Sequence, residues 1–181
     1  TVLVRTFDNG SNISLATQAS PVGNLTIRPS PSWKGRMIDA LGRPIDGGAE
    51  LILGQESLSV DNAPPNAMVR KLVQKPIRTG VRVIDIFTPL CKGQRIGIFA
   101  GSGVGKSTIL SMLSSAAGFD TVIVILVGER GREVTEFIER DLVPEAGKRS
   151  VVIVATSDEP PMVRVRASLV AGKGPPWTIA G

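Results

Sequence analysis

The chain has 181 residues, of which 42% are hydrophobic and 20% charged, a composition typical of a folded protein. Lys and Arg exceed Asp and Glu by 21 − 16 = 5, but the charges are scattered and only 4% of residues are aromatic, which argues against a nucleic-acid-binding surface. The absence of histidine excludes Ser-His triads and most zinc sites, and a single cysteine excludes an internal disulfide.

The longest apolar runs have the length of strands. They are Val122–Val127 and Val151–Ala155, far shorter than a membrane-spanning helix. No signal peptide is visible at the N-terminus. A soluble, cytoplasmic protein is therefore expected.

Residues 1–30 alternate short polar and apolar runs separated by turn sequences, which predicts short antiparallel strands. The runs are Thr1–Phe7, Ile13–Ala16 and Leu25–Ile27. Two or three such strands cannot bury a core alone. We therefore expect this segment to be part of a small N-terminal β-barrel.

Residues 31–80 are rich in glycine and proline, which is typical of a connecting segment. Short strands are expected near Gly35–Ile38 and Glu50–Leu53. Pro64-Pro65 favours extended backbone and is a plausible linker. The remainder, residues 81–181, has a different pattern and is expected to form the core.

In this third segment, apolar runs alternate with helical periodicity. Strands are expected at Arg95–Ala100, Thr121–Val127 and Ser150–Ala155, and helices at Lys106–Ala117 and Glu133–Leu142. Gly118 is expected to end the first helix, and Pro144 and Gly147 the second. The order strand, helix, strand, helix, strand predicts an α/β fold in which helices cover a parallel sheet.

The junction between the first strand and the first helix has the pattern of a P-loop, Ala100-Gly-Ser-Gly-Val-Gly-Lys-Ser107. Its glycines let backbone N–H groups wrap phosphates, and the helix N-terminus attracts the same anion. Lys106 is expected to reach the β and γ phosphates of ATP, and the Ser107 hydroxyl to bind Mg²⁺. The full set of expected phosphate-binding residues is Gly101, Ser102, Gly103, Val104, Gly105, Lys106, Ser107 and Thr108. Ala100 replaces the usual first glycine, which matters only if this position needs a positive φ.

Glu129 follows the strand Thr121–Val127 directly. Parallel strands deliver their carboxyl ends to one edge of a sheet, where ligands bind, so Glu129 is placed to face the γ phosphate. A carboxylate there could orient or polarise the attacking water. From spacing alone, the alternative is that Glu129 and Arg130 are simply a charged pair in a loop.

Together these segments resemble the flagellar and type III secretion export ATPases, which are related to the catalytic subunit of rotary ATP synthases. The similarity runs from about residue 20 to about residue 169, and alanine at position 100 is usual in that subgroup. The segments that carry it are Trp33–Gly47, Gly80–Asp85, Ala100–Ser107, Val127–Val134 and Ser157–Pro161.

The resemblance implies a RecA-like P-loop core and a homohexamer with Mg-ATP at the subunit interfaces. It implies the export apparatus and exported proteins as partners, no nucleic acid, and at most a peripheral association with the membrane. It also implies that Glu129 is the catalytic glutamate, with Lys106 and Arg130 near the γ phosphate. A glutamate at this position favours the hydrolysing members of the family over those that only bind nucleotide.

The C-terminal part departs from the family. Gly172–Pro176 are expected to break a helix that continues in the family, and a downstream Mg-associated aspartate, adenine pocket and interface arginine are missing. An arginine finger contributes roughly a thousand- to a hundred-thousand-fold to phosphoryl transfer. Modest ATP binding and near-background hydrolysis are therefore expected of this chain alone, consistent with a truncated or frameshifted gene product.

Two alternatives remain at this point. The first is a truncated nucleotide-binding fragment without hydrolytic activity, whose incomplete sheet exposes an apolar edge. The second is a hexameric RNA helicase, which would need a basic groove bearing aromatic residues. Residues 1–30 contain Phe7 as their only aromatic residue, which disfavours the helicase.

Overall fold

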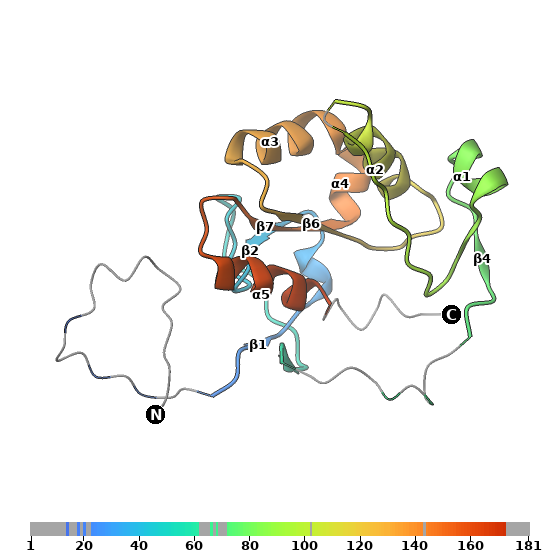
Figure 1. Ribbon diagram of the computed structural model, residues 1–181. Helices are drawn as coiled ribbons and strands as arrows, with labels where there is room; N and C mark the ends of the chain where they lie inside the picture. Colours follow the sequence, from blue (N-terminus) through green and yellow to red (C-terminus); the bar gives the residue numbers. More distant parts are fainter. Residues whose placement is uncertain are drawn as a thin grey trace.

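The computed structural model describes residues 14, 18, 20, 23–61, 66, 68, 72–101, 103–142 and 144–172 (Figure 1). In chain order the elements are β1 (Thr26–Ile27), η1 (Pro31–Trp33), β2 (Met37–Asp39), β3 (Leu58–Ser59), β4 (Pro76–Ile77), α1 (Arg82–Phe87), β5 (Leu90–Cys91), α2 (Lys106–Ser114), β6 (Val122–Val127), α3 (Gly131–Glu136), η3 (Phe137–Asp141), α4 (Pro144–Arg149), β7 (Ser150–Ala155) and α5 (Pro161–Ala171).

The central sheet has the order β2-β7-β6, and both strand pairs are parallel. At the middle of the sheet, Ile153 of β7 lies opposite Ile38 of β2 on one side and Ile125 of β6 on the other. The connection from β6 to β7 runs through α3, η3 and α4, as a parallel pair requires a crossover. This arrangement confirms the predicted α/β fold with a parallel sheet.

Strand β7 is covered on both of its faces, and all six of its residues are buried. Val151, Ile153 and Ala155 belong to the core on the side of α5. Val152 and Val154 belong to a second core with residues of α3, η3 and α4. Figure 1 shows α5 on one side of the sheet and α3 and α4 on the other. The continuous apolar run of β7 is therefore explained, because alternate side chains enter different cores.

Strand β6 is parallel as predicted, but it is less buried than expected. Among the described residues it pairs only with β7, so its other edge carries no strand. Ile125 is 41% exposed and Val127 38% exposed. An open edge lined with apolar side chains is the feature that the sequence associated with an incomplete sheet.

The predicted strand Arg95–Ala100 is wrong for the described structure. These residues have no strand pairing, Ile96 is 42% exposed and Phe99 is 97% exposed. A strand forms only where a neighbouring strand supplies its hydrogen bonds. The segment is not part of the sheet of β2, β7 and β6. Its apolar sequence alone is therefore not sufficient to form a paired strand.

The predicted strand at Glu50–Leu53 is also wrong. The carbonyl of Ile52 accepts hydrogen bonds from the Ser30 hydroxyl (2.6 Å) and from Trp33 Nε1 (3.0 Å), so side chains occupy the acceptor that a strand would use. Instead, β3 forms a few residues later and pairs antiparallel with β1. The strand predicted at Gly35–Ile38 exists as β2, so the segment that was expected to connect two parts contributes to the central sheet.

The predicted helices exist, with different ends. Helix α2 ends at Ser114, four residues before Gly118. The second predicted helix begins earlier, at Gly131, and passes from α3 into η3. Pro144 does not simply stop it but begins α4, because proline suits the first turn of a helix. Helix α5 ends at Ala171 with Gly172 as its C-cap, as the glycine predicts.

Most of the predicted N-terminal barrel segment lies outside the described residues. The strand expected at Leu25–Ile27 is present as β1, whereas Thr1–Phe7 and, apart from Ser14, Ile13–Ala16 are not described. The barrel therefore stays a prediction. Within the described parts of the chain, no helix combines the length and the apolar character needed to cross a membrane.

The segment before the sheet is held by a bidentate ion pair. Arg36 donates from Nε (2.6 Å) and Nη2 (2.8 Å) to the carboxylate of Asp46, which also accepts the N–H groups of Met37 and Gly48. These bonds, with Arg36 contributing most, hold the pKa of Asp46 well below its usual value. They stabilise the residues beside β2 and so link the Trp33–Gly47 segment to the sheet.

We expect Asp46→Asn to lower the free energy of unfolding by about 1 kcal/mol at pH 7, because it breaks this pair. The pKa of Asp46 is lower in the folded than in the unfolded chain, so its contribution is complete above about pH 4 and is lost as the pH falls below that. Urea unfolding at pH 7 and pH 3 checks this. Asp61→Asn, at an exposed position, is the control. An equal loss at both pH values would contradict the prediction.

Candidate functional site

The P-loop has backbone angles that require glycine at two positions. Gly103 has φ +74° and Gly105 has φ +96°, both in the left-handed region, and Gly105 is the N-cap of α2. Apart from the glycine itself and its neighbours in the chain, no heavy atom lies within 4 Å of a Cβ built on Gly101, Gly103 or Gly105. The loop therefore has open space on the side where a ligand could approach its backbone. Ser102, which was also predicted to bind phosphate, lies outside the described residues.

Ala100 does not need the freedom of glycine. No described residue other than glycine has a positive φ, so Ala100 adopts a backbone conformation that any residue tolerates. The departure from the usual first glycine therefore costs the loop nothing in backbone strain.

The first turn of α2 presents the other predicted phosphate-binding residues. Lys106, Ser107 and Thr108 are its first three residues, and the N–H groups of a first turn have no partner within the helix. The helix dipole adds a partial positive charge at this end. The N-terminus of this nine-residue helix follows a glycine-rich loop and begins with a lysine, so it is suited to bind an anion with several oxygens.

Glu129 lies across from this turn. Its Oε1 is 3.6 Å from Lys106 Nζ, so the structure brings together two side chains that are 23 residues apart in sequence (129 − 106). The loop of Glu129 is attached to the residues that follow β7: Gly128 N–H donates to Ala155 (2.8 Å), and Ser157 N–H donates to the carbonyl of Glu129 (3.0 Å). The Ser157–Pro161 segment therefore supports the loop that carries the glutamate.

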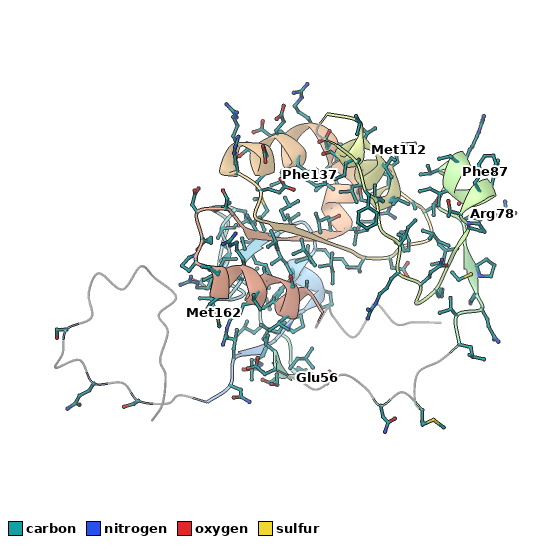
Figure 2. All side chains as sticks on the ribbon, viewed as in Figure 1. Glu56, Arg78, Phe87, Met112, Phe137 and Met162 are labelled. Carbon is teal, nitrogen blue, oxygen red and sulfur yellow. The ribbon has the colours of Figure 1, made fainter. Side chains whose placement is uncertain are left out.

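A cavity of about 440 Å³ lies between the P-loop and the helical layer. Its size is within the range of small-molecule sites. It is lined by Gly101, Gly103, Gly105, Lys106, Ser107, Thr108, Leu110, Leu126, Glu129, Glu133, Val134, Glu136, Phe137 and Asp141. Phe137, labelled in Figure 2 between the helices and the sheet, contributes an apolar wall.

Three acidic residues that line the cavity were not predicted as site residues: Glu133, Glu136 and Asp141. Glu133 and Glu136 are three residues apart and so share one face of α3. That spacing, directly after Glu129, is the signal by which the sequence could have placed them. Asp141, at the end of η3, had no such signal, because the irregular turn of η3 brings it to the cavity.

Glu133 has a structural task at the start of α3. Its Oε2 accepts the backbone N–H of Arg130 at 3.3 Å, and this bond, followed by a hydrogen bond with Glu129, lowers its pKa. Arg130 is the N-cap residue of α3, and its side chain is exposed and does not line the cavity. Of the three predicted catalytic residues, the structure thus brings Lys106 and Glu129 together and leaves Arg130 facing outwards.

Mg²⁺ would fit this site as a partner of a bound phosphate. The described residues contain no group of three His, Cys, Asp or Glu side chains that could hold a metal ion. Mg²⁺ commonly keeps several waters and binds through one or two protein oxygens and substrate phosphates. The Ser107 hydroxyl, on the first turn of α2, fits that role.

Comparison with known proteins points to one family. Residues 80–173 match the model of the ATP synthase alpha/beta family, nucleotide-binding domain. The chain is 58% identical over 149 residues to the flagellum-specific ATP synthase of Agrobacterium fabrum, covering 82% of this chain and 31% of the relative. It is 52% identical over 170 residues to that of Rhizobium meliloti, covering 94% and 36%. The chain thus spans about a third of the length of these relatives.

Solved structures give the same picture. The ATPase EscN, assembled in complex with its central stalk EscO from the enteropathogenic E. coli type III secretion system, is 40% identical, with a TM-score of 0.74. The match covers 82% of this chain and 36% of that chain. A prototypical type III secretion ATPase gives the same TM-score and identity.

We expect Gly105→Ala to destabilise the chain by about 1–2 kcal/mol, because an alanine side chain is strained in the left-handed region. Gly101→Ala is the matched control, since Gly101 has no positive φ and a Cβ there meets no atom. Urea unfolding of the two variants checks this. Equal effects of the two substitutions would contradict the loop geometry.

Proposed function

Because the chain belongs to the ATP synthase alpha/beta family, we propose that it binds Mg-ATP in the cavity beside α2 and takes part in ATP hydrolysis that drives flagellar or type III protein export. The observation that carries this proposal is the approach of Lys106 Nζ to Glu129 Oε1, 3.6 Å apart, at a helix N-terminus formed by positive-φ glycines. An ammonium that can bind phosphate and a carboxylate that can orient water, at one end of a phosphate-binding loop, are two of the groups that ATP hydrolysis uses.

The residues divide the work by charge. Backbone N–H groups at Gly101, Gly103 and Gly105 and the first turn of α2 would hold the phosphate oxygens, and Lys106 would leave Glu129 to neutralise the β and γ phosphates. Mg²⁺, bound through Ser107, would supply further positive charge to the phosphates.

Glu129, once released by Lys106, would be the acceptor that orients the attacking water. General-base assistance of this kind contributes about a hundred- to ten-thousand-fold to a rate. Arg130 is part of the proposal as a second cation for the γ phosphate, and it is one residue from Glu129. In the structure its side chain is exposed, so this role requires it to turn towards the cavity.

The features of the whole protein belong to the proposal as well. Two solved structures of one relative, EscN, are of the assembled ATPase, one of them with its central stalk EscO, which supports a homohexamer that works with an export apparatus and its exported proteins. A cytoplasmic location, a peripheral contact with the membrane and the absence of a nucleic-acid partner stay predictions. Names of flagellar and secretion ATPases among the relatives favour the export function over the helicase.

We expect the unaltered chain to bind Mg-ATP saturably and Lys106→Ala to bind it about ten- to a hundredfold more weakly, because a charged hydrogen-bonding partner of the phosphates is lost. Isothermal titration calorimetry measures both. Lys148→Ala is the control, since Lys148 is an exposed cation paired with Glu145 on α4. A folded, unaltered chain that does not bind ATP would overturn the proposed site.

We expect Glu129→Gln to keep ATP affinity within a few-fold and to abolish whatever single-turnover hydrolysis the unaltered chain shows above the uncatalysed background, because the general base is lost. Quenched-flow measurement of released phosphate checks this. If the unaltered chain binds ATP but hydrolyses it only at background, the chain is a nucleotide-binding fragment, and the hydrolytic part of the proposal fails for it. Full activity in Glu129→Gln would remove Glu129 from the mechanism.

A further inference from the structure

Helix α2 carries the phosphate-binding residues but is weakly held along its length. Ser114, its last residue, is its only buried residue. Leu110 is 40% exposed, and Met112, labelled on α2 in Figure 2, is 46% exposed. The segment that precedes the P-loop, 95–100, makes no ladder with the sheet. Neither side-chain packing along α2 nor the preceding segment, residues 95–100, therefore does much to fix the direction of the N-terminus of α2.

The C-terminal end of α2 is, in contrast, tied by Arg149. Its Nη2 donates to the carbonyls of Ser114 (3.0 Å) and Ala116 (2.9 Å), and its Nη1 donates to the carbonyl of Phe119 (2.9 Å). Carbonyls at the end of a helix have no partners within it, and the dipole makes this end negative. A planar guanidinium can reach all three at once, which a lysine ammonium on its flexible stem does less well.

Arg149 is itself anchored to the most buried part of the molecule. It is followed by Ser150, the first residue of β7, which is 0% exposed. The Ser150 hydroxyl donates to the carbonyl of Ala146 (2.6 Å), and the backbone carbonyl of Ser150 accepts the N–H of Gly35 (2.8 Å). The three bonds of Arg149 thus connect the end of α2 to the central strand of the sheet.

Two further links each use a single carbonyl. The Ser111 hydroxyl, in the middle of α2, donates to the carbonyl of Asp141, and Lys34 Nζ donates to the carbonyl of Asp120, beyond the end of the helix, at 3.2 Å. Lys34 is an exposed contact with a single carbonyl. Arg149 is therefore the principal polar anchor of α2 among the described residues.

From these contacts we propose that Arg149 is a positioning residue for nucleotide binding. It holds the carbonyl of Ser114, the last residue of α2, and the carbonyls of Ala116 and Phe119 just after the helix, and so aims Lys106 and the first-turn N–H groups at the cavity. A nine-residue helix is about 13 Å long and moves as a rigid rod, so a shift of one end moves the other. Arg149 does not touch the ligand. The inference rests on the proposed function, because it concerns the affinity of that site.

The test compares Arg149→Met, Arg149→Lys and Lys148→Met by calorimetric titration with Mg-ATP below the unfolding temperature. We expect Arg149→Met to weaken ATP binding about tenfold, Arg149→Lys to recover part of that loss, and Lys148→Met to change nothing, because Lys148 contacts Glu145 on the same helix. Unchanged affinity in a folded Arg149→Met, or an equal loss in Lys148→Met, would overturn the proposal. If Arg149→Met does not fold, unchanged affinity in Arg149→Lys overturns it.

Hydrogen exchange without nucleotide separates this inference from the proposed function. We expect the amides of α2 to exchange faster in Arg149→Met while those of β7 keep their protection, since only the tie to α2 is cut. If the unaltered chain does not bind ATP, the proposed function fails, and exchange alone decides whether Arg149 anchors α2. Unchanged exchange in α2 would then refute the anchor as well.

Discussion

Strand β7 is paired with a parallel strand on each side and covered by helices on each face, and the other elements take their places from it. Its register sets β6 and β2, with Ile153 between Ile125 and Ile38. Its alternate side chains divide the interior into two cores, one with α5 and one with α3, η3 and α4. Because five consecutive apolar residues, Val151–Ala155, are removed from water on both faces, this strand has little freedom to slip without exposing them.

The candidate site inherits its geometry from that strand through short polar links. The loop with Glu129 is bonded to Ala155, the last residue of β7, and to Ser157 just after it. Arg149, the residue directly before β7, is bonded to the end of α2. Glu129 and Lys106 therefore meet although the segment before the P-loop is not in the sheet. Two ends of one rigid strand thus position the two halves of the site.

The acidic side of the cavity gives the site a particular electrostatic character. Glu129, Glu133, Glu136 and Asp141 line it opposite Lys106 and the helix N-terminus. In the proposed function, a phosphate group entering there would exchange the Lys106–Glu129 contact for its own contact with Lys106. The carboxylates would then disfavour a second anion and favour cations such as Mg²⁺ on that side. Charge of both signs in one cavity is what distinguishes this site from a simple anion-binding loop.

The local sequence was sufficient to predict the elements that depend on a residue and its near neighbours in the chain. The glycines of the P-loop require positive φ at 103 and 105, the buried run 150–155 and the α2 periodicity are unambiguous, and Glu129 follows its strand directly. Only the tertiary structure decided the features that depend on contacts with distant parts of the chain. Residues 95–100 and 50–53 have sequences typical of strands. The first pairs with no strand among the described residues, and in the second the Ile52 carbonyl accepts hydrogen bonds from Ser30 and Trp33. The same holds for two contacts between residues distant in sequence. Lys106 lies 3.6 Å from Glu129, and Arg149 donates hydrogen bonds to three carbonyls near the end of α2. No local pattern encodes such contacts, because the packing of other elements sets their geometry.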